Sequence, residues 1–259
     1  MSSRLKKRKE YTALSYILTL FVYGLIFVAL IIVGNIGSYY ITNHQNQVAT
    51  TDNPSTSITT NDYQARLLAT RELIKQANVY IQLDYDDTSE IGSGTIVSLD
   101  DEYYYAITNY HVLERENGVA TNKFVKTFDN ISSNFEIIAF SEDLDLALIK
   151  FTKLNRSSIE PINTDNLNIN IEDIILAIGN PYGNIGSITY GSIIRMTTIK
   201  ELEIDRYVIE HDAPLFTGSS GGALVDEAGN LIGINSWEKN GLFYAIPITV
   251  INTFLENNL

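Results

Sequence analysis

The region after residue 75 consists mostly of short runs of β-branched, aliphatic and aromatic residues, separated by glycine, asparagine, aspartate and serine. Runs of this kind between turn residues predict β-strands, and segment 226–230 has the composition of a hairpin turn. The pattern therefore predicts an all-β fold of about 180 residues, which is large enough to bury a full core. The predicted strands cover residues 79–83, 95–99, 103–108, 136–140, 145–151, 174–178, 187–194, 207–210, 223–225, 231–235 and 242–246.

The N-terminal region has a different pattern, in which the basic residues 1–10 are followed by an uncharged, apolar stretch. A helix over residues 13–36 would be roughly 36 Å long at about 1.5 Å per residue, which is enough to cross a bilayer. We therefore predict a transmembrane helix over residues 11–38 with a cytoplasmic N-terminus, which places the rest of the chain outside the cytoplasm. A flexible linker rich in Asn, Thr and Ser is predicted over residues 39–62. A cleaved signal peptide is the alternative for the apolar stretch.

Charge and composition exclude several function classes. The 259 residues include 31 acidic and 18 basic residues, for a formal net charge of −13. Residues 1–10 contribute +5 and −1, a net of +4, so residues 11–259 carry −17. Such an acidic domain does not attract nucleic acid or anionic lipid surfaces. There is no cysteine, and no His and carboxylate spacing of a metal motif occurs, so we expect neither a metal nor a cofactor.

The segment 217–224, Thr-Gly-Ser-Ser-Gly-Gly-Ala-Leu, places a serine among glycines. Glycine permits positive φ angles and lets a substrate carbonyl approach the main chain closely. The amides of Gly218 and Ser220 can then converge on a developing negative charge as an oxyanion hole, and Ser220 is the candidate nucleophile. A plain turn between two strands is the alternative interpretation of this segment.

A nucleophilic serine needs a base, and the chain has three histidines. His111 follows a β-rich run at a polar turn, which predicts a position on a loop at the end of a strand. His44 lies in the polar linker, and His211 is only nine residues before Ser220. His111 is therefore the candidate base by elimination, because imidazole can take up and return a proton near neutral pH. A surface histidine without a role is the alternative.

The third member of such a site is a carboxylate that orients the imidazole. Asp145 begins an apolar strand and is therefore expected at the edge of the core. Asp143 is its rival, because residues two apart in a strand lie on the same face. The resulting chain order of His, Asp and Ser is that of chymotrypsin-type enzymes. In so acidic a chain, a solvated aspartate without a role is the alternative.

Further motifs accompany these residues: Gly-Ser-Gly-Thr-Ile-Val at 92–97, Thr-Asn-Tyr-His-Val at 108–112, Asp-Leu-Ala-Leu at 145–148, Ala-Ile-Gly-Asn-Pro-Tyr-Gly at 177–183, Gly-Ser-Ser-Gly-Gly-Ala-Leu at 218–224, Leu-Ile-Gly-Ile-Asn at 231–235 and Phe-Tyr-Ala-Ile-Pro at 243–247. In sequence and order they resemble the HtrA/Deg-type trypsin-like serine proteases. The resemblance implies two antiparallel β-barrels of the chymotrypsin type, over residues 75–158 and 159–250, with the active site in the cleft between them. We expect the protease domain to cover residues 63–259 and to begin with a helix over residues 63–77.

The resemblance also places a substrate pocket near Pro214, Leu215 and the edge strand of Ile234, Asn235 and Ser236. No acidic residue stands where a pocket selective for Arg or Lys needs one, so we expect a preference for small or medium apolar side chains. Where digestive relatives have an aspartate before the nucleophile, this chain has an uncharged serine, which argues against activation by cleavage of an N-terminus.

In this sequence 39 residues follow Ser220 (259 − 220), so we expect no PDZ domain of the kind that many relatives carry. The resemblance is compatible with a homo-oligomer, namely a trimer. Together these features predict a membrane-anchored serine endopeptidase that acts on protein or peptide substrates, including unfolded ones, in extracytoplasmic quality control or processing. The alternative is a catalytically silent, membrane-tethered module that binds peptides in the same cleft. An esterase of the α/β-hydrolase fold is disfavoured, because Gly-x-Ser-x-Gly is absent and the histidine precedes the serine.

Overall fold

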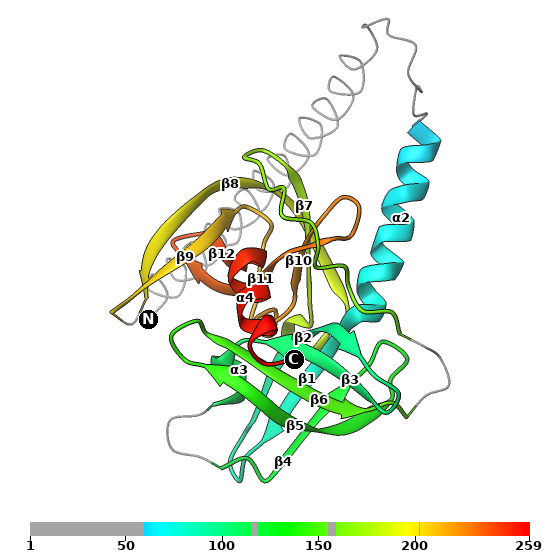
Figure 1. Ribbon diagram of the computed structural model, residues 1–259, viewed down its shortest axis with the longest axis vertical. Helices are drawn as coiled ribbons and strands as arrows, with labels where there is room; N and C mark the ends of the chain where they lie inside the picture. The colour runs from blue at the N-terminus through cyan, green and yellow to red at the C-terminus, as the bar shows by residue number, and fades with distance from the viewer. Residues whose placement is uncertain (1–59, 115–118, 155–158, 202) are drawn as a thin grey trace, which may run out of the picture. The chain divides into compact units, whose positions relative to one another are not determined.

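The structure is a computed structural model (Figure 1). The predicted N-terminus over 1–10 and transmembrane helix over 11–38 lie outside the described residues, as does the linker over 39–62 apart from its last residues. Within the part of the chain that is described, no helix combines the length and apolar character needed to cross a bilayer. The described residues are 60–114, 119–154, 159–201 and 203–259.

A long helix, α2 (Thr60–Ala77), precedes the strands and starts three residues before the predicted 63–77. One face of α2 packs against the core, because Ile74 and Ala77 are each 1% exposed and belong to the core cluster. The Thr70 hydroxyl donates to the Glu227 carbonyl at 2.9 Å, so the helix is attached to the turn at 226–230. This contact places α2 beside the second half of the domain (Figure 1).

The first six strands form a closed barrel in the order β1-β2-β3-β6-β5-β4. Alternate side chains such as Val79, Ile81 and Ile149 are fully buried inside it, as the period of two in a strand requires. A short helix, α3 (Tyr110–Leu113), follows β3. The strand β4 was not predicted, because only Phe124 and Val125 of its five residues are apolar. The strands are β1 (Asn78–Asp84), β2 (Ser89–Leu99), β3 (Tyr103–Thr108), β4 (Asn122–Lys126), β5 (Ser132–Ser141) and β6 (Leu146–Thr152).

The next six strands form a second closed barrel in the order β10-β11-β12-β9-β8-β7. A 3₁₀ turn, η1 (Pro181–Gly183), follows β7, and the C-terminal helix α4 (Ile248–Glu256) follows β12. The hairpin turn predicted at 226–230 is confirmed, with Gly229 at a φ of 87°. The strands are β7 (Ile174–Gly179), β8 (Ser187–Glu201), β9 (Ile204–His211), β10 (Ala223–Asp226), β11 (Leu231–Lys239) and β12 (Leu242–Pro247).

The two barrels share a hydrophobic core. One cluster contains Ile107 and Leu148 of the first barrel together with Ile178 and Ile234 of the second, and all four are at most 1% exposed. The buried side chains of α4, including Ile251, belong to the same cluster. The loops at the ends of β3, β6, β7 and β10 are therefore held in fixed positions around one cleft, because their strands pack against each other.

Candidate active site

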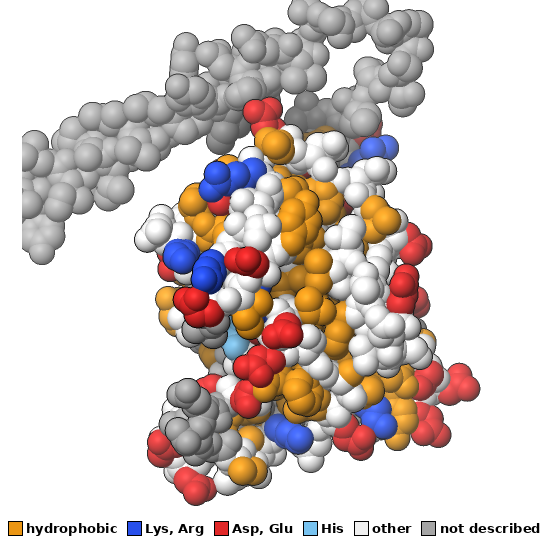
Figure 2. Space-filling view, turned by 60° about the vertical axis from the view of Figure 1, so that its left-hand side comes forward, with side chains coloured by type: hydrophobic (Ala, Val, Ile, Leu, Met, Phe, Trp, Pro, Cys, Tyr) orange, Lys and Arg blue, Asp and Glu red, His pale blue; other side chains and the backbone are white. Residues whose placement is uncertain are grey.

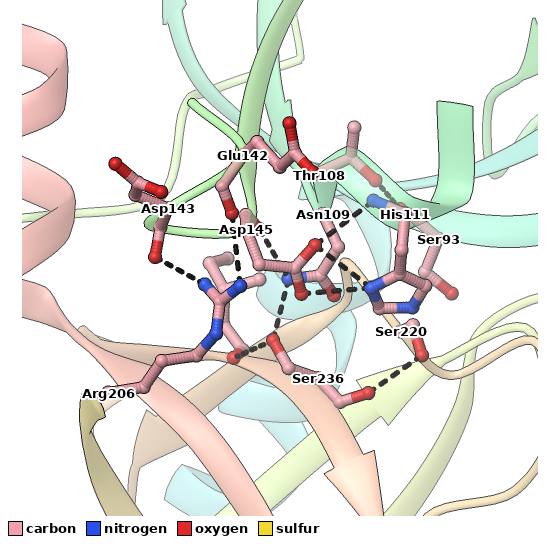
Figure 3. Close-up of polar contacts among 11 residues, drawn as sticks. Ser93, Thr108, Asn109, His111, Glu142, Asp143, Asp145, Arg206, Ser220 and Ser236 are labelled. Atoms are coloured by element: carbon pink, nitrogen blue, oxygen red, sulfur yellow. Dashed lines mark hydrogen bonds and ion pairs between the residues drawn. The ribbon is translucent and has the colours of Figure 1, made fainter. Parts of the chain in front are cut away.

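His111 and Asp145 meet at the edge of the first barrel (Figure 3). His111 Nδ1 lies 2.8 Å from Asp145 Oδ2 and 3.0 Å from Oδ1, and the His111 backbone amide donates to Oδ1 at 3.0 Å. An ionised carboxylate only accepts hydrogen bonds, so the contact requires a proton on Nδ1, and in the neutral imidazole Nε2 then has the lone pair. The imidazole is 44% exposed, whereas the carboxylate is 5% exposed. The pair therefore presents a basic nitrogen to the cleft.

The main chain around Asp145 is held in an unusual conformation. Its φ is 52°, in the left-handed region that a residue other than glycine rarely adopts. The Asp145 carbonyl accepts hydrogen bonds from Asn109 Nδ2 at 3.0 Å and from the Tyr110 amide at 3.2 Å. Asn109, which is fully buried, also donates to Ser236 Oγ at 2.6 Å. Asn109 thus connects the carboxylate loop to the second barrel.

The rival carboxylate, Asp143, is exposed and lies away from the imidazole (Figure 3). Its carbonyl, not its carboxylate, makes the contact to the second barrel, through Arg206 Nη1. The alternation of a strand does not extend to Asp143, because residues 142–145 form a turn in which the Asp145 amide donates to the Glu142 carbonyl at 3.0 Å. The geometry therefore places Asp145 rather than Asp143 beside His111.

Ser220 comes from the second barrel, in the loop before β10, and its side chain lies beside the imidazole (Figure 3). Its hydroxyl donates to the Ser236 carbonyl at 3.0 Å. Its own carbonyl accepts the Ser93 amide at 2.8 Å. The residue is thus fixed by one strand of each barrel, since Ser93 belongs to β2 and Ser236 to β11.

The residues before Ser220 form a tight turn. The Ser219 amide donates to the Phe216 carbonyl at 2.8 Å, and the Phe216 amide donates to Ser219 Oγ at 3.2 Å. The Tyr182 amide donates to the Thr217 carbonyl at 2.9 Å. Because a trans peptide is planar, the N–H of Gly218 points away from Tyr182. Gly218 has a φ of 98°, which glycine adopts without strain.

The amides of Gly218 and Ser220, predicted to form the oxyanion hole, donate to no other group of the described chain. Buried backbone donors usually have partners, so a pair of unused N–H groups in one loop is a site for an acceptor. The amides of Ser219, Gly221 and Gly222 in the same loop are used, since they donate to the carbonyls of Phe216, Asn235 and Ser219. The loop is therefore arranged to offer two donors next to Ser220.

Ser93 connects this loop to the first barrel. Its hydroxyl donates to the Gly218 carbonyl at 2.7 Å and accepts the Asn180 amide at 2.9 Å, and the residue is fully buried. A Cβ at Gly221, which has a φ of 87°, would lie 2.0 Å from the Ser93 carbonyl. The close approach of the loop to β2 therefore requires glycine at this position.

A cavity of about 300 Å³ opens next to Ser220. Of the predicted pocket residues, Leu215 and Ser236 line it, and Pro214, Ile234 and Asn235 do not. Ile234 and Asn235 are fully buried, because Ile234 belongs to the shared core and Asn235 Nδ2 donates to the carbonyls of Ile178 and Ala223. Pro214 is exposed, and its carbonyl accepts Thr189 Oγ1 at 2.9 Å. The other lining residues are Tyr182, Phe216, Thr217, Ser219, Ser220, Trp237 and Glu238.

The sequence interpretation missed Tyr182, Phe216 and Trp237 as pocket residues. The rings of Tyr182 and Phe216 are 6.3 Å apart, although 34 positions separate them in the chain (216 − 182), so no local spacing indicates the contact. Trp237 could have been predicted as a pocket residue, because it directly follows Ser236 of the predicted edge strand. Glu238 is exposed, and its carboxylate accepts the Gly241 amide at 2.8 Å.

His211, the other candidate base within the described chain, lies inside the second barrel. It is fully buried, and its ring centroid is 6.1 Å from that of Phe243. Burial lowers the pKa of His211 to about 4, against the opposing charge of Asp212, so the ring is neutral near pH 7. His211 is therefore a core residue and not a partner of Ser220.

No three His, Cys, Asp or Glu side chains of the described residues gather as a metal site requires. The groups that meet at the cleft are a hydroxyl, an imidazole, a carboxylate and two backbone donors. These groups together can perform acyl transfer by nucleophilic catalysis.

Comparison with known proteins places this site in a family. The family model described as "Trypsin-like peptidase domain" matches residues 92–234, which is more than half of the chain. A protein of Buchnera aphidicola named "Probable periplasmic serine endoprotease DegP-like" is 36% identical over 171 residues, covering 62% of this chain and 35% of that protein. "Serine endoprotease DegS" of Haemophilus influenzae is 32% identical over 184 residues, covering 67% of this chain and 51% of that protein. The chain thus spans about a third to a half of the length of these relatives.

Solved structures agree with this comparison. "HtrA-type protease AlgW with tripeptide" has a TM-score of 0.62 at 27% identity, over 74% of this chain and 62% of that one. A serine endoprotease from Yersinia pestis has a TM-score of 0.60 at 28% identity, over 80% of this chain and 67% of that one. The two closed barrels are therefore those of the chymotrypsin-like fold, and the chain belongs to the HtrA/DegS-type family of trypsin-like serine proteases.

Proposed function

We propose that this protein is a serine endopeptidase in which Ser220 is the nucleophile, His111 the general base and acid, and Asp145 the residue that orients His111. The proposal rests on one observation: the side chains of His111, Asp145 and Ser220, which come from two barrels, lie together at one site. His111 and Asp145 form a hydrogen-bonded pair on the first barrel, and Ser220 lies beside them on the second (Figure 3). Family membership supports the same chemistry.

The reaction begins when the Ser220 hydroxyl turns from the Ser236 carbonyl to His111 Nε2. The oxygen attacks the scissile carbonyl while Nε2 takes its proton, and the two unused amides of Gly218 and Ser220 stabilise the negative oxygen. The imidazolium, stabilised by Asp145, then protonates the leaving amine, and an acyl-enzyme remains. Water, deprotonated by His111, attacks the acyl group and releases the second product.

The cavity beside Ser220 is proposed to hold the side chain that precedes the scissile bond. Its volume of about 300 Å³ suits a small or medium side chain, and Leu215, Phe216 and Trp237 supply the apolar part of its lining. Glu238 is the one acidic residue among those that line the cavity; it is exposed, and one of its carboxylate oxygens accepts the Gly241 amide. We therefore propose peptides with small or medium apolar side chains as substrates.

The proposed cellular setting rests on the sequence. The uncharged residues 11–38 after a basic N-terminus support a single-pass anchor in the cell membrane, with a cytoplasmic N-terminus and the protease domain outside the cytoplasm. We propose quality control or processing of extracytoplasmic proteins as the role. On the face in Figure 2, basic side chains are scattered among acidic ones, which supports a protein substrate rather than nucleic acid.

A homo-oligomer, with three copies, is also proposed. On α2 the side chains of Tyr63, Leu68 and Leu73 are 43%, 58% and 39% exposed, which supports burial against another copy. Sedimentation of the full-length protein in detergent checks this, and a single-copy species at every concentration would contradict it.

A fluorophosphonate probe tests the activity, because such probes react with the serine of an assembled hydrolase site. We expect the full-length protein to be modified at Ser220, with labelling lost in Ser220→Ala and His111→Ala, as measured by mass spectrometry of peptides. Ser89→Ala is the control, since it removes an exposed hydroxyl of β2 and keeps the nucleophile. Absent labelling of the folded protein, even with unfolded protein added, together with retained peptide binding, would favour the catalytically silent module.

A further inference from the structure

A buried arginine of the second barrel donates hydrogen bonds to the turn that contains Asp145. Arg206 belongs to β9 and is 8% exposed. Its Nη1 donates to the Asp143 carbonyl, and its Nη2 donates to the Glu142 carbonyl at 3.0 Å (Figure 3). Both acceptors are main-chain groups of the first barrel. A charged donor is expensive to bury and is retained where its hydrogen bonds fix a structure, so this contact marks the turn as a place where position matters.

The same turn sets the conformation of Asp145. The Glu142 carbonyl that accepts Arg206 also accepts the Asp145 amide at 3.0 Å. Asp145 has a φ of 52°, an unfavourable conformation that persists only where the surroundings enforce it. Asn109 donates a hydrogen bond to the carbonyl of Asp145, and Arg206 donates to the carbonyls of Glu142 and Asp143, which precede it. The carboxylate is thus fixed from both directions along the chain.

Arg206 also touches the wall of the substrate cavity. Its guanidinium carbon lies 5.3 Å from the centroid of the Trp237 ring, an arrangement that favours the cation. Trp237 lines the cavity and directly follows Ser236, whose carbonyl accepts the Ser220 hydroxyl. Arg206 therefore stands between the segment that contacts the nucleophile and the turn that positions the carboxylate.

We propose that Arg206 is a positioning residue, which keeps the Asp145 carboxylate within hydrogen-bond distance of His111 Nδ1. It also links the turn before Asp145 to Trp237 in the wall of the substrate cavity. The inference deepens the proposed function and rests on it. Arginine suits the position because its planar guanidinium can donate to the carbonyls of Glu142 and Asp143 at once while it lies over the Trp237 ring. Lysine has a single ammonium and cannot satisfy both carbonyls and the ring in the same way.

The test compares the full-length protein with Arg206→Met, Arg206→Lys and the control Arg195→Met. Met keeps much of the stem of Arg206 and removes its donors. Arg195 donates twice to Glu210 in the same barrel, so its loss removes a similar number of hydrogen bonds away from the turn. The first measurement is the second-order rate of Ser220 labelling by a small fluorophosphonate, at a temperature at which all variants are folded by circular dichroism.

We expect Arg206→Met to lower the labelling rate by roughly 10- to 100-fold, since small displacements of a catalytic group have effects of this size. Arg206→Lys should recover part of the loss, and Arg195→Met should stay within about threefold of the original protein. The second measurement is the strongly downfield proton NMR signal of His111 Nδ1–H bound to Asp145. This signal should weaken or shift in Arg206→Met and persist in Arg195→Met.

Unchanged labelling and an unchanged His111 signal in folded Arg206→Met would overturn the role of Arg206. Equal losses in Arg206→Met and Arg195→Met would do so as well, because they would show a general effect of stability. If Arg206→Met does not fold, the same two measurements on Arg206→Lys decide the matter. Failure of the proposed function looks different, since the original protein would then show the His111 signal but no labelling of Ser220.

Discussion

At the scale of single residues, each candidate catalytic side chain depends on a neighbour that has no reactive role. Asn109 holds the carbonyl of Asp145 and reaches across to Ser236. Ser93 binds the loop of Ser220 through both its amide and its hydroxyl. These supporting side chains are fully buried and their polar groups are used in more than one contact. Their loss should therefore lower both the rate of the reaction and the stability of the fold.

Ser93→Ala gives a direct check of this dependence. The substitution removes the donor to the Gly218 carbonyl and the acceptor of the Asn180 amide, which frees the loop that presents the two unused amides. We expect a roughly 10- to 100-fold lower kcat on a peptide substrate, by analogy with loss of an oxyanion donor, and a loss of about 1–3 kcal/mol in the free energy of unfolding. Ser89→Ala, an exposed serine of the same strand, is the control and should change neither quantity. A kcat within twofold of the original for Ser93→Ala would contradict the role.

The two neighbouring aspartates should respond very differently to loss of charge. Asp145→Asn keeps the shape of the side chain but favours the wrong tautomer of His111, so kcat should fall by about 10⁴. Asp143→Asn should change kcat by less than about twofold, because only the Asp143 carbonyl makes a contact to the second barrel. Steady-state kinetics on one peptide substrate decides between them, and similar losses in both variants would refute the assignment.

At the scale of elements, the strands set distances while the loops at their ends supply the reactive groups. His111 follows β3, Asp145 precedes β6, and Ser220 precedes β10. The strand β9 adds two residues with opposite roles, since Arg206 reaches the first barrel and His211 is buried inside the second. A single strand thus contributes to the site at one end and to the core at the other.

The buried histidine of β9 should make the fold sensitive to acid. The pKa of His211 falls from 6.5 to about 4 on burial. Between these values the unfolded chain binds a proton that the folded chain does not, so the free energy of unfolding falls as pH is lowered, by about 1.4 kcal/mol per pH unit and about 3 kcal/mol in all. Above pH 6.5 this contribution is constant.

His211→Leu should remove this part of the pH dependence. Urea unfolding of both proteins at several pH values between 4 and 7 measures it. We expect the free energy of unfolding of the original protein to fall more steeply than that of His211→Leu as the pH is lowered from 7 to 4. A constant difference over the whole range would show that His211 does not titrate as described.

Strand prediction from alternating and apolar runs succeeded even for β5, in which only Phe135 is buried, and it failed at β4, in which only Phe124 and Val125 are apolar. The positions of His111, Asp145 and Ser220 could be proposed from local motifs. Tyr182 and Arg206 could not, because closure of the second barrel and its packing on the first bring them to the site. Asn235 was assigned to the pocket as part of the edge strand that the family resemblance implied, yet its side chain donates to the carbonyls of Ile178 and Ala223.

At the scale of the whole molecule, the shared core ties the two barrels into one unit. Ile107 and Leu148 pack in the same cluster as Ile178 and Ile234, so neither barrel can separate without exposing apolar surface. The candidate site lies across this junction, with reactive groups on both sides. Cooperative loss of the site and of the fold follows from this arrangement.

Unfolding in urea should therefore show one midpoint for three signals. The fluorescence of Trp237, the only tryptophan, reports the second barrel, circular dichroism reports all strands, and fluorophosphonate labelling reports the site. We expect the three midpoints to agree within about 0.3 M, as coincident probes do in a two-state transition. Loss of labelling well before the other signals would show that the barrels part while each remains folded.

The division of the reactive groups between the two barrels also has a consequence for synthesis on the ribosome. Ser220 follows His111 by 109 positions (220 − 111), and the carbonyl of Ser236, which holds the Ser220 hydroxyl, is made later still. A growing chain that has completed the first barrel has a base and its carboxylate but no nucleophile. On the proposed function, peptide cleavage therefore requires nearly the whole domain, because the nucleophile and the carbonyl that binds it are made after the first barrel.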